Sequence, residues 1–320
     1  MLSLCMHKEW SPRHIDTKKD GFTIVELLIV VVVIAILAAI TIVSYNGIQN
    51  RAKQSAIQSS ASQAGKKLLA HAIVNAETLP TDLASVGITD SGATTYKYVY
   101  DSSVKPNLFC VSATQGAFSY AATSKSSQTI EGQCVNNTVY NPSFETNTSG
   151  WAAAGSSGSV LTRVTTESYS GGASLQVATN GAAVQQGAFN SSRGPAQPNT
   201  TYTASVWIKA AVGRTVRIEL GEWDSAPQLL NGSSRKPGAT ITGDGTWQRH
   251  TVEHTTGATA ATADIVIRSM TSPAHTFYID GVMLSEGSAQ LAYGDGNSVG
   301  WSWSGAANNT TSLGPTVLLP

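Results

Sequence analysis

The sequence predicts an α+β domain, made of one long amino-terminal helix and a small antiparallel sheet, followed by an all-β sandwich or jelly roll. Three observations lead to this fold class. An apolar run of 22 residues extends from Phe22 to Val43 with one charged residue, Glu26. From Thr89 the pattern changes to short alternating segments, and six of the seven tryptophans lie beyond residue 150. Long apolar runs are typical of spanning helices, and short alternating segments of strands.

The composition limits the classes of partner. The 320 residues hold 20 Lys+Arg and 20 Asp+Glu, and only 12% are charged, against roughly 25% in an ordinary soluble domain. A chain without surplus positive charge offers phosphates no general attraction, so we predict no nucleic-acid partner. For the same reason we expect recognition to rest on aromatic and hydrogen-bonding contacts, with a weak dependence on salt.

The apolar run is long enough to cross a bilayer. At ~1.5 Å per residue it spans roughly 33 Å, which disfavours a buried core helix. The 20 residues before it are polar and contain no apolar segment, unlike an ordinary secretory signal. A carboxylate in hydrocarbon is costly, so we expect Glu26 to be functional and paired. The alternative is an acid that the helix dipole favours near a helix start.

The helix is expected to continue beyond the membrane to Pro80, over some 55 residues. Gly47 and Gly65 each cost a helix about 1 kcal/mol relative to alanine, which predicts local softening. Apolar residues recur with a period near 3.6 and predict one buried stripe, formed by Ile48, Ala52, Ala56, Ala61, Leu68, Ala72 and Ile73.

The residues that open the apolar run, Gly21, Phe22, Thr23, Ile24, Val25 and Glu26, resemble the amino-terminal motif of type IV pilins and pseudopilins. The resemblance implies a leader at 1–21 and a prepilin peptidase that cuts after Gly21 and methylates the new amine of Phe22. It implies that Glu26 neutralises the terminal amine of a neighbouring subunit during assembly. Many pilins carry a proline about twenty residues into the mature helix; Thr41 to Ser44 hold none, so no kink is implied there.

The same resemblance implies partners and a location. The partners are other pilin subunits, the prepilin peptidase and an inner-membrane assembly platform. The location is the bacterial cytoplasmic membrane, crossed once, and after assembly the extracellular pilus.

A small head follows the helix. Strand-like segments predict an antiparallel sheet packed on the helix; they are Thr95–Tyr100, Leu108–Ala113 and Phe118–Ala122. Cys5 falls in the leader, which leaves Cys110 and Cys134, 24 positions apart. Their number and spacing predict one disulfide in an oxidising compartment, the alternative being two buried free thiols. Their position resembles the carboxy-terminal disulfide loop of pilins.

A second domain of β-sandwich type is expected after the head. Regular short strands with turns between them predict it; they are Ser174–Ala178, Thr201–Ala210, Thr215–Leu220, Trp247–Glu253, Asp264–Arg268 and Thr276–Leu284. We therefore divide the chain into a leader at 1–21, helix and head at 22–134, a sandwich at 138–286 and a Gly/Asn/Trp-rich tail at 287–320. The tail is either a hairpin with exposed rings at Trp301 and Trp303 or a strand that closes on a neighbour.

Six short motifs in the sandwich occur in an order that resembles the jelly-roll carbohydrate-binding modules found beside bacterial xylanases and glucanases. They are Asn141–Glu145, Gly150–Trp151, Ser170–Val177, Pro198–Ala210, Thr246–Trp247 and Tyr278–Leu284. The resemblance implies a structural Ca²⁺ held by Glu145 and Asp280, with backbone carbonyls near Gly171–Ser174. The alternative is that both acids are plain surface residues. The resemblance also implies that Trp151 and Trp247 are structural core residues.

A glycan site needs an aromatic face for sugar C–H groups and polar partners for hydroxyls. Strand alternation directs suitable side chains away from the apolar face. The predicted carbohydrate-binding residues are Trp207, Arg217, Glu219, Trp223 and Arg268; the alternative is that each is an ordinary sandwich residue.

Two motifs resemble catalytic signatures without the required context. His250, Glu253 and His254 form H-x-x-E-H, but in a strand Glu253 points away from both histidines. Residues 296–300 form G-x-S-x-G without a strand before it and a helix after it. We therefore predict no catalytic residues and no enzyme.

The combined features predict a type IV pilus subunit that polymerises through its helix and presents a glycan- or surface-binding sandwich, and a minor, adhesive subunit is the kind that fits them. The alternative is a pseudopilin of a type II secretion or DNA-uptake system with a purely structural sandwich. A membrane-anchored hydrolase is the third class.

Overall fold

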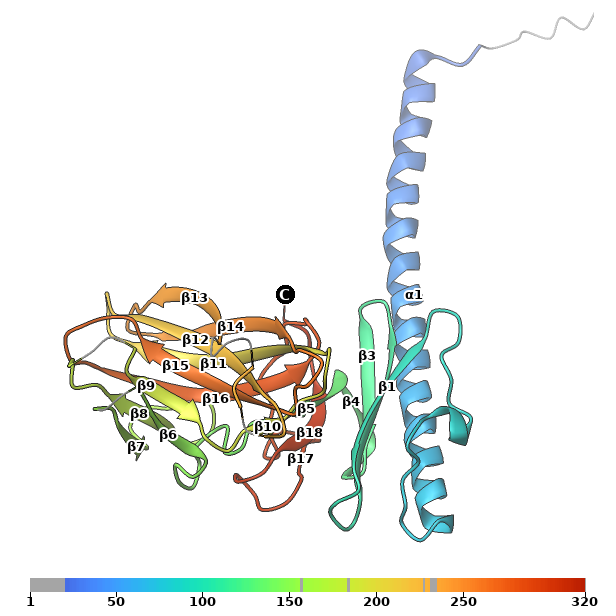
Figure 1. Ribbon diagram of the computed structural model, residues 1–320. Coiled ribbons are helices and arrows are strands. Elements are labelled where there is room, and N and C mark those ends of the chain that lie inside the picture. Colours follow the sequence, from blue (N-terminus) through green and yellow to red (C-terminus); the bar gives the residue numbers. More distant parts are fainter. Residues whose placement is uncertain (1–20, 156–157, 183–184, 227, 231–234, 320) are drawn as a thin grey trace, which may run out of the picture. The chain divides into compact units, whose positions relative to one another are not determined.

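The computed structural model describes residues 21–155, 158–182, 185–226, 228–230 and 235–319 (Figure 1). The predicted leader therefore lies outside the described residues except for Gly21. The chain divides into two compact units, residues 1–52 and 53–320.

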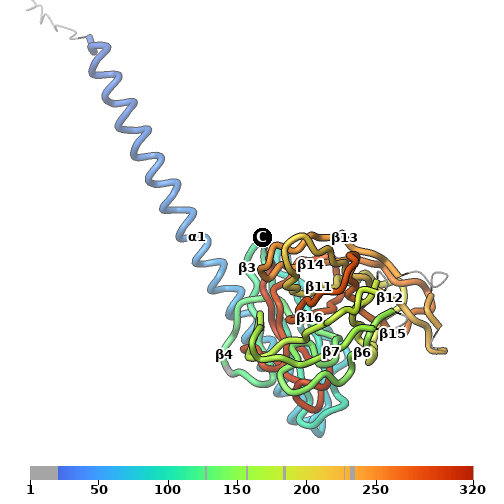
Figure 2. The backbone as a smooth tube through the Cα atoms, turned by 90° about the vertical axis from the view of Figure 1, so that its left-hand side faces the viewer, coloured from blue at the N-terminus to red at the C-terminus, as the bar shows by residue number. Residues whose placement is uncertain are grey.

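Helix α1 (Ile24–Val74) begins with a capping box. The backbone N–H of Glu26 donates to Thr23 Oγ1 (3.2 Å), and the backbone N–H of Thr23 donates to Glu26 Oε2 (2.9 Å). Residues 24–52 form an unbroken helix (Figure 2). Among the described residues, α1 is the one helix long and apolar enough to cross a membrane.

The buried stripe of α1 differs from the predicted one. Ala61 and Leu68 are buried as predicted, together with Ile57 and Ala64, whereas Ile48 and Ile73 of the predicted stripe are exposed. The helix also ends before Pro80, because Ala76 and Glu77 adopt positive φ angles (51° and 62°) and turn the chain away. Gly65 has a packing role in the structure. A Cβ there would lie 2.6 Å from Cβ of Ala122, so glycine allows the helix to pack closely on the sheet.

The head contains a short 3₁₀ helix, η1 (Ala84–Val86), and the predicted antiparallel sheet in the order β1-β2-β3-β4. Its strands are β1 (Thr95–Asp101), β2 (Leu108–Gln115), β3 (Phe118–Thr123) and β4 (Ser126–Glu131). Phe109 and Val111 of β2 share a core with Leu68 of α1. The predicted Cys110–Cys134 disulfide is confirmed, with the Cα atoms 5.6 Å apart.

Two antiparallel sheets form the predicted sandwich. The first, which we call the β12 sheet, has the order β13-β12-β15-β9-β6, with β10 also paired to β15. Its strands are β6 (Trp151–Ala154), β9 (Gly187–Asn190), β10 (Gly194–Pro195), β12 (Thr215–Trp223), β13 (Lys236–Thr242) and β15 (Thr262–Ser269). The second, which we call the β11 sheet, has the order β14-β11-β16-β8-β7. Its strands are β7 (Val160–Val164), β8 (Ser174–Ala178), β11 (Thr201–Ala210), β14 (Trp247–Thr255) and β16 (Thr276–Glu286).

The core of the sandwich is formed by the inward residues of both sheets. Val216, Ile218 and Leu220 from the β12 sheet share one cluster with Val206 and Ile279 from the β11 sheet. Because strand side chains alternate, the residues between these point to the outer faces of the two sheets.

The tail is part of the fold and not an exposed hairpin. Strands β5 (Gln133–Asn137), β18 (Ser312–Thr316) and β17 (Ser302–Trp303) lie side by side in the order β17-β18-β5 (Figure 1). Pro315 pairs with Cys134, so the tail returns to the strand that precedes the sandwich. Trp301 is 3% exposed and packs with Val135 and Met283.

Candidate functional site

The outer face of the β12 sheet carries charged and aromatic side chains in strand register. On β12 and β15, Arg217 lies opposite Arg268, Gly221 opposite Asp264 and Trp223 opposite Thr262. These residues alternate with the buried apolar residues of the core, so they share the outer face.

Glu219 holds two arginines together at one end of this face. Its side chain is 8% exposed and accepts hydrogen bonds from Nε of Arg217 (3.0 Å) and Nε of Arg268 (2.9 Å). Arg268 also donates through Nη1 to the carbonyl of Gln185 (3.0 Å). Burial alone raises the pKa of Glu219, but the hydrogen bonds and charges of the two arginines outweigh it, so that the pKa lies below its ordinary value. The carboxylate is therefore ionised at neutral pH and fixes both guanidinium groups.

A second ion pair and an aromatic ring lie at the other end. Arg235 donates to both oxygens of the fully buried Asp264, through Nε (3.1 Å) and Nη2 (2.8 Å). A Cβ on Gly221 would lie 2.3 Å from Oδ1 of Asp264, so only glycine leaves room for this pair. The guanidinium carbon of Arg193 lies 3.5 Å from the ring centroid of Trp223.

Between the two ends lies a shallow cavity of about 230 Å³. Phe189, Val266, Arg235 and Arg268 line it together with residues 153–155. Phe189 is half-buried and lies opposite Val266. A half-buried ring between guanidinium groups can stack on the C–H face of a sugar while the arginines donate to its oxygens.

The structure brings together four of the five predicted carbohydrate-binding residues: Arg217, Glu219, Trp223 and Arg268. Trp207 lies on β11, in the opposite sheet, and stacks on Tyr169 with the ring centroids 3.9 Å apart. Trp247 was expected in the core, but it is half-buried and lies against Tyr169, with centroids 6.3 Å apart.

The sequence did not single out Phe189, Arg193, Arg235 or Asp264. Asp264 could have been predicted, because it lies four residues from Arg268 on the same strand and therefore on the same face. Arg193 and Arg235 lie outside the predicted strands, where alternation says nothing about direction.

The predicted calcium ligands both hold the loop at 168–173. Oδ2 of the buried Asp280 accepts backbone N–H groups of Tyr169 (2.8 Å) and Ser170 (2.9 Å), and Glu145 accepts that of Gly172 (3.1 Å). Burial raises the pKa of Asp280 to about 7; the backbone hydrogen bonds lower it, and the charge of Glu145 raises it further. Among the residues that the structure describes, neither carboxylate forms an ion pair, and two such neighbouring carboxylates fit a hard cation by donor chemistry. Within the described ranges no three His, Cys, Asp or Glu side chains form a metal-binding group, so backbone carbonyls would have to complete such a site.

At the amino terminus, Phe22 is 85% exposed and Glu26 is held by Thr23 in the capping box. In the sandwich, His250 is buried, whereas Glu253 is exposed and His254 lies 3.4 Å from Glu222. As predicted from alternation, the H-x-x-E-H residues do not converge.

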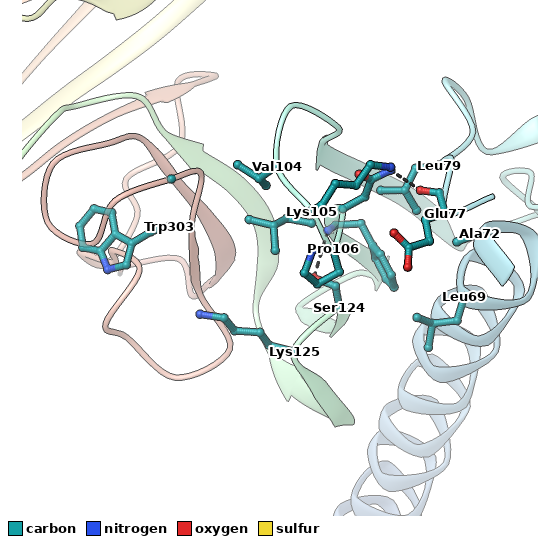
Figure 3. A pocket seen from close by; sticks show the side chains of 14 residues that line it. Leu69, Ala72, Glu77, Leu79, Val104, Lys105, Pro106, Ser124, Lys125 and Trp303 are labelled. Atoms are coloured by element: carbon teal, nitrogen blue, oxygen red, sulfur yellow. Dashed lines mark hydrogen bonds between the residues drawn. The ribbon is translucent and has the colours of Figure 1, made fainter. Parts of the chain in front are cut away.

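A second cavity lies in the head (Figure 3) and has a volume of about 470 Å³. Its lining is mainly apolar, with Leu69 and Leu79 on one side and Trp303 on the other, while Glu77, Lys105 and Lys125 add three charges. It lacks the paired carboxylates and arginines of the β12 sheet, which remains the better candidate site.

Two protein families match separate parts of the chain. Residues 16–42 match the prokaryotic N-terminal methylation motif, and residues 136–274 match a carbohydrate binding domain. The chain joins a type IV pilin-like amino terminus to a carbohydrate-binding domain. Both families are of non-catalytic kinds, and the pilin-like helix fits anchoring in a membrane. No curated protein matches the sequence.

Several solved structures resemble the carbohydrate-binding domain. The xylan-binding domain of Xyn10C from Paenibacillus barcinonensis is 16% identical with a TM-score of 0.37, over 48% of this chain and 95% of that chain. The CBM22-1 and GH10 modules of endo-1,4-beta-D-xylanase 10B from Clostridium thermocellum are 20% identical with a TM-score of 0.39, over 50% of this chain and 30% of that chain. Tailspike protein 4 of bacteriophage CBA120 is 15% identical with a TM-score of 0.39, over 47% of this chain and 21% of that chain. Likenesses this low carry no weight for the function.

Proposed function

We propose that the protein is a minor, adhesive type IV pilus subunit that binds a glycan on the outer face of the β12 sheet. The observation that carries the proposal is the arrangement of buried, ionised Glu219 between Arg217 and Arg268 on a face that is not the core. Burying ion pairs stabilises a fold little compared with apolar packing. A sheet surface that only had to be soluble would not need them, whereas a polyol-binding surface needs fixed donors.

Each residue has a distinct part in the proposed binding. Phe189 and Trp223 supply apolar ring surface for the C–H faces of sugars. Arg217 and Arg268 donate their remaining N–H groups to ligand oxygens. Glu219 positions both guanidinium groups, so little side-chain entropy is lost on binding. The proposal is for binding without catalysis.

For assembly we propose the route that the pilin-like terminus supports. A prepilin peptidase cuts after Gly21 and methylates the amine of Phe22, and α1 holds the subunit in the bacterial cytoplasmic membrane until the assembly platform adds it to the fibre. In the fibre Glu26 exchanges its bond to Thr23 for the amine of Phe22 of a neighbouring subunit, because an amine partner compensates a carboxylate better than a hydroxyl in an apolar surrounding.

We also propose that Ca²⁺, when bound at Glu145 and Asp280, neutralises both carboxylates and fixes the loop at 168–173 to the last long strand of the sandwich. Addition of Ca²⁺ to the EDTA-treated full chain is expected to raise its free energy of unfolding by about 2–3 kcal/mol at a concentration near 100 times Kd. Urea unfolding followed by far-UV circular dichroism measures this. Asp280→Asn should abolish the response, and Glu167→Gln, which removes an acid paired with Lys209 instead, should preserve it. A wild type with the same free energy of unfolding in EDTA and in Ca²⁺ would contradict the site.

The glycan proposal is tested with the full chain in neutral detergent on a glycan array. The wild type is expected to bind a subset of polysaccharides, and Trp223→Ala should reduce that binding at least tenfold, because it removes the ring under Arg193. Trp247→Ala is the matched control, since this tryptophan is also half-buried but belongs to the opposite sheet. Absence of any glycan binding by the wild type, or equal loss in both variants with the fold retained, would refute the proposal.

A further inference from the structure

The outer face of the β12 sheet has a local charge that the composition conceals. We propose that its ligand is an anionic polysaccharide whose sugars carry carboxylates; this inference rests on the proposed glycan binding and specifies its substrate class. The chain as a whole has a formal net charge of zero. On this one face, however, positive side chains outnumber negative ones by two. The arginines are Arg193, Arg217, Arg235 and Arg268, and the carboxylates are Glu219 and Asp264.

A ligand on this face meets guanidinium groups and not carboxylates. The side chains of Glu219 and Asp264 are 8% and 0% exposed, and both are occupied by arginines. Arg217 and Arg235 remain 23% and 18% exposed. Planar guanidinium groups match carboxylates with two parallel hydrogen bonds, which favours an acidic sugar over a neutral one.

The end of the face at Trp223 is short of acceptors. Arg193 has no carboxylate within 4.0 Å among the residues that the structure describes, and its charge rests on the Trp223 ring. Nε of Arg193 and Nε1 of Trp223 are both buried donors without an acceptor in the described part of the chain. Both atoms are enclosed, so what a ligand meets at this end is the half-buried guanidinium of Arg193, whose positive charge no carboxylate of the described residues pairs with.

Two nearby acids are engaged by backbone N–H groups. Glu222 alternates to the other side of β12, where it accepts the backbone N–H of Gly257 (2.7 Å) and faces His254. Asp224 follows the strand and accepts the backbone N–H groups of Ala226 and Gln228 (3.0 and 2.9 Å). From Arg217 to Trp223 the positive strip extends roughly 20 Å at ~3.3 Å per residue, which is long enough to follow a chain of several sugars.

The test compares charged oligosaccharides with neutral counterparts of the same backbone. Binding of the full chain in neutral detergent is measured by calorimetry for hexamers of galacturonate and of mannuronate, and for their methyl esters. We expect the free acid of at least one hexamer to bind at least tenfold more tightly than its ester at 20 mM NaCl. We expect that advantage to fall at least threefold at 200 mM NaCl, because exposed charges are screened.

Two single-residue variants test whether Arg193 causes the preference for the acidic oligosaccharide. Arg193→Gln should lower the affinity for the acid by a factor at least five times larger than the factor by which it lowers the affinity for the ester. Arg51→Gln, which removes one exposed charge from α1, should change neither. Equal affinity for acid and ester, an advantage that salt does not weaken, or an unchanged preference in Arg193→Gln would overturn the inference while glycan binding itself stands. If no oligosaccharide, charged or neutral, binds, the proposed function fails and this inference fails with it.

Discussion

Replacement of Trp301 by alanine is expected to lower the free energy of unfolding by about 4 kcal/mol, within the range for large buried aromatic side chains. The ring is 3% exposed and packs with Val135, Met283 and Leu291. It fills the space where a Cβ on Gly314 would lie, 2.3 Å from the ring, and its Nε1 donates to the carbonyl of Pro315 (2.7 Å). Its loss would leave a cavity at the point where the tail joins the head strand β5.

Trp303 provides the matched control two residues away. Its ring is half-buried, and its Nε1 donates to the side chain of Asn297 (3.1 Å). Trp303→Ala should therefore destabilise the chain by about 1–2 kcal/mol. Urea unfolding of the full chain, followed by far-UV circular dichroism, compares the two. Similar small losses in both variants would contradict a structural role for the tail.

Acidification from pH 7.5 to 4.5 is expected to remove about 2–3 kcal/mol of stability through His250. Burial lowers the pKa of His250 to about 4, and neither ring nitrogen has a hydrogen-bond partner among the described residues. The unfolded chain binds this proton below its ordinary pKa of about 6.5, whereas the folded chain resists it until about pH 4. Because the unfolded state binds more protons in this window, stability falls as the pH falls.

The comparison that isolates His250 uses His250→Leu, which removes the titrating group and retains apolar volume. Urea unfolding of both proteins is measured at pH 7.5 and 4.5. The wild type should lose about 2–3 kcal/mol more than the variant between these values, while other titrating groups affect both alike. Equal pH dependence in the two proteins would show that His250 is accessible to protons in the folded state.

Local sequence signals predicted the elements that depend on local chemistry. The apolar run and the motif around Glu26 predicted α1, and strict alternation predicted strands such as β8 and β11 with the bounds that the structure gives. The tail could not be placed in the same way. Strand β18 is short and pairs with β5, nearly 180 residues earlier, and nothing in its own sequence specifies that partner.

The candidate site shows the same division between local and non-local information. Alternation correctly directed Trp207 and Trp223 away from the core, but it could not tell which sheet each strand joins. The sequence therefore grouped Trp207 with residues of the opposite sheet. Phe189 and Arg193 reach the outer face of the β12 sheet only through the pairing of β9 and β10 with β15.

Net charge and local charge lead to different expectations about recognition. A total of zero predicted weak salt dependence, because composition averages over all faces. Strand register places Arg217 and Arg268 on one face, where Arg193 and Arg235 join them from outside the strands, and the two carboxylates of this face are occupied in ion pairs. Local charge, and not the total, governs attraction of a ligand within about 10 Å, the screening length at 0.1 M salt.

Hydrogen–deuterium exchange of the full chain in detergent, with and without a bound oligosaccharide, tests the central claim most directly. Binding to the outer face of the β12 sheet should slow backbone exchange in β9, β12 and β15 and leave β11 and β14 unchanged, because only the former strands carry the site. Protection confined to β11 and β14, or no protection in any strand of the sandwich at saturating ligand, would contradict the account.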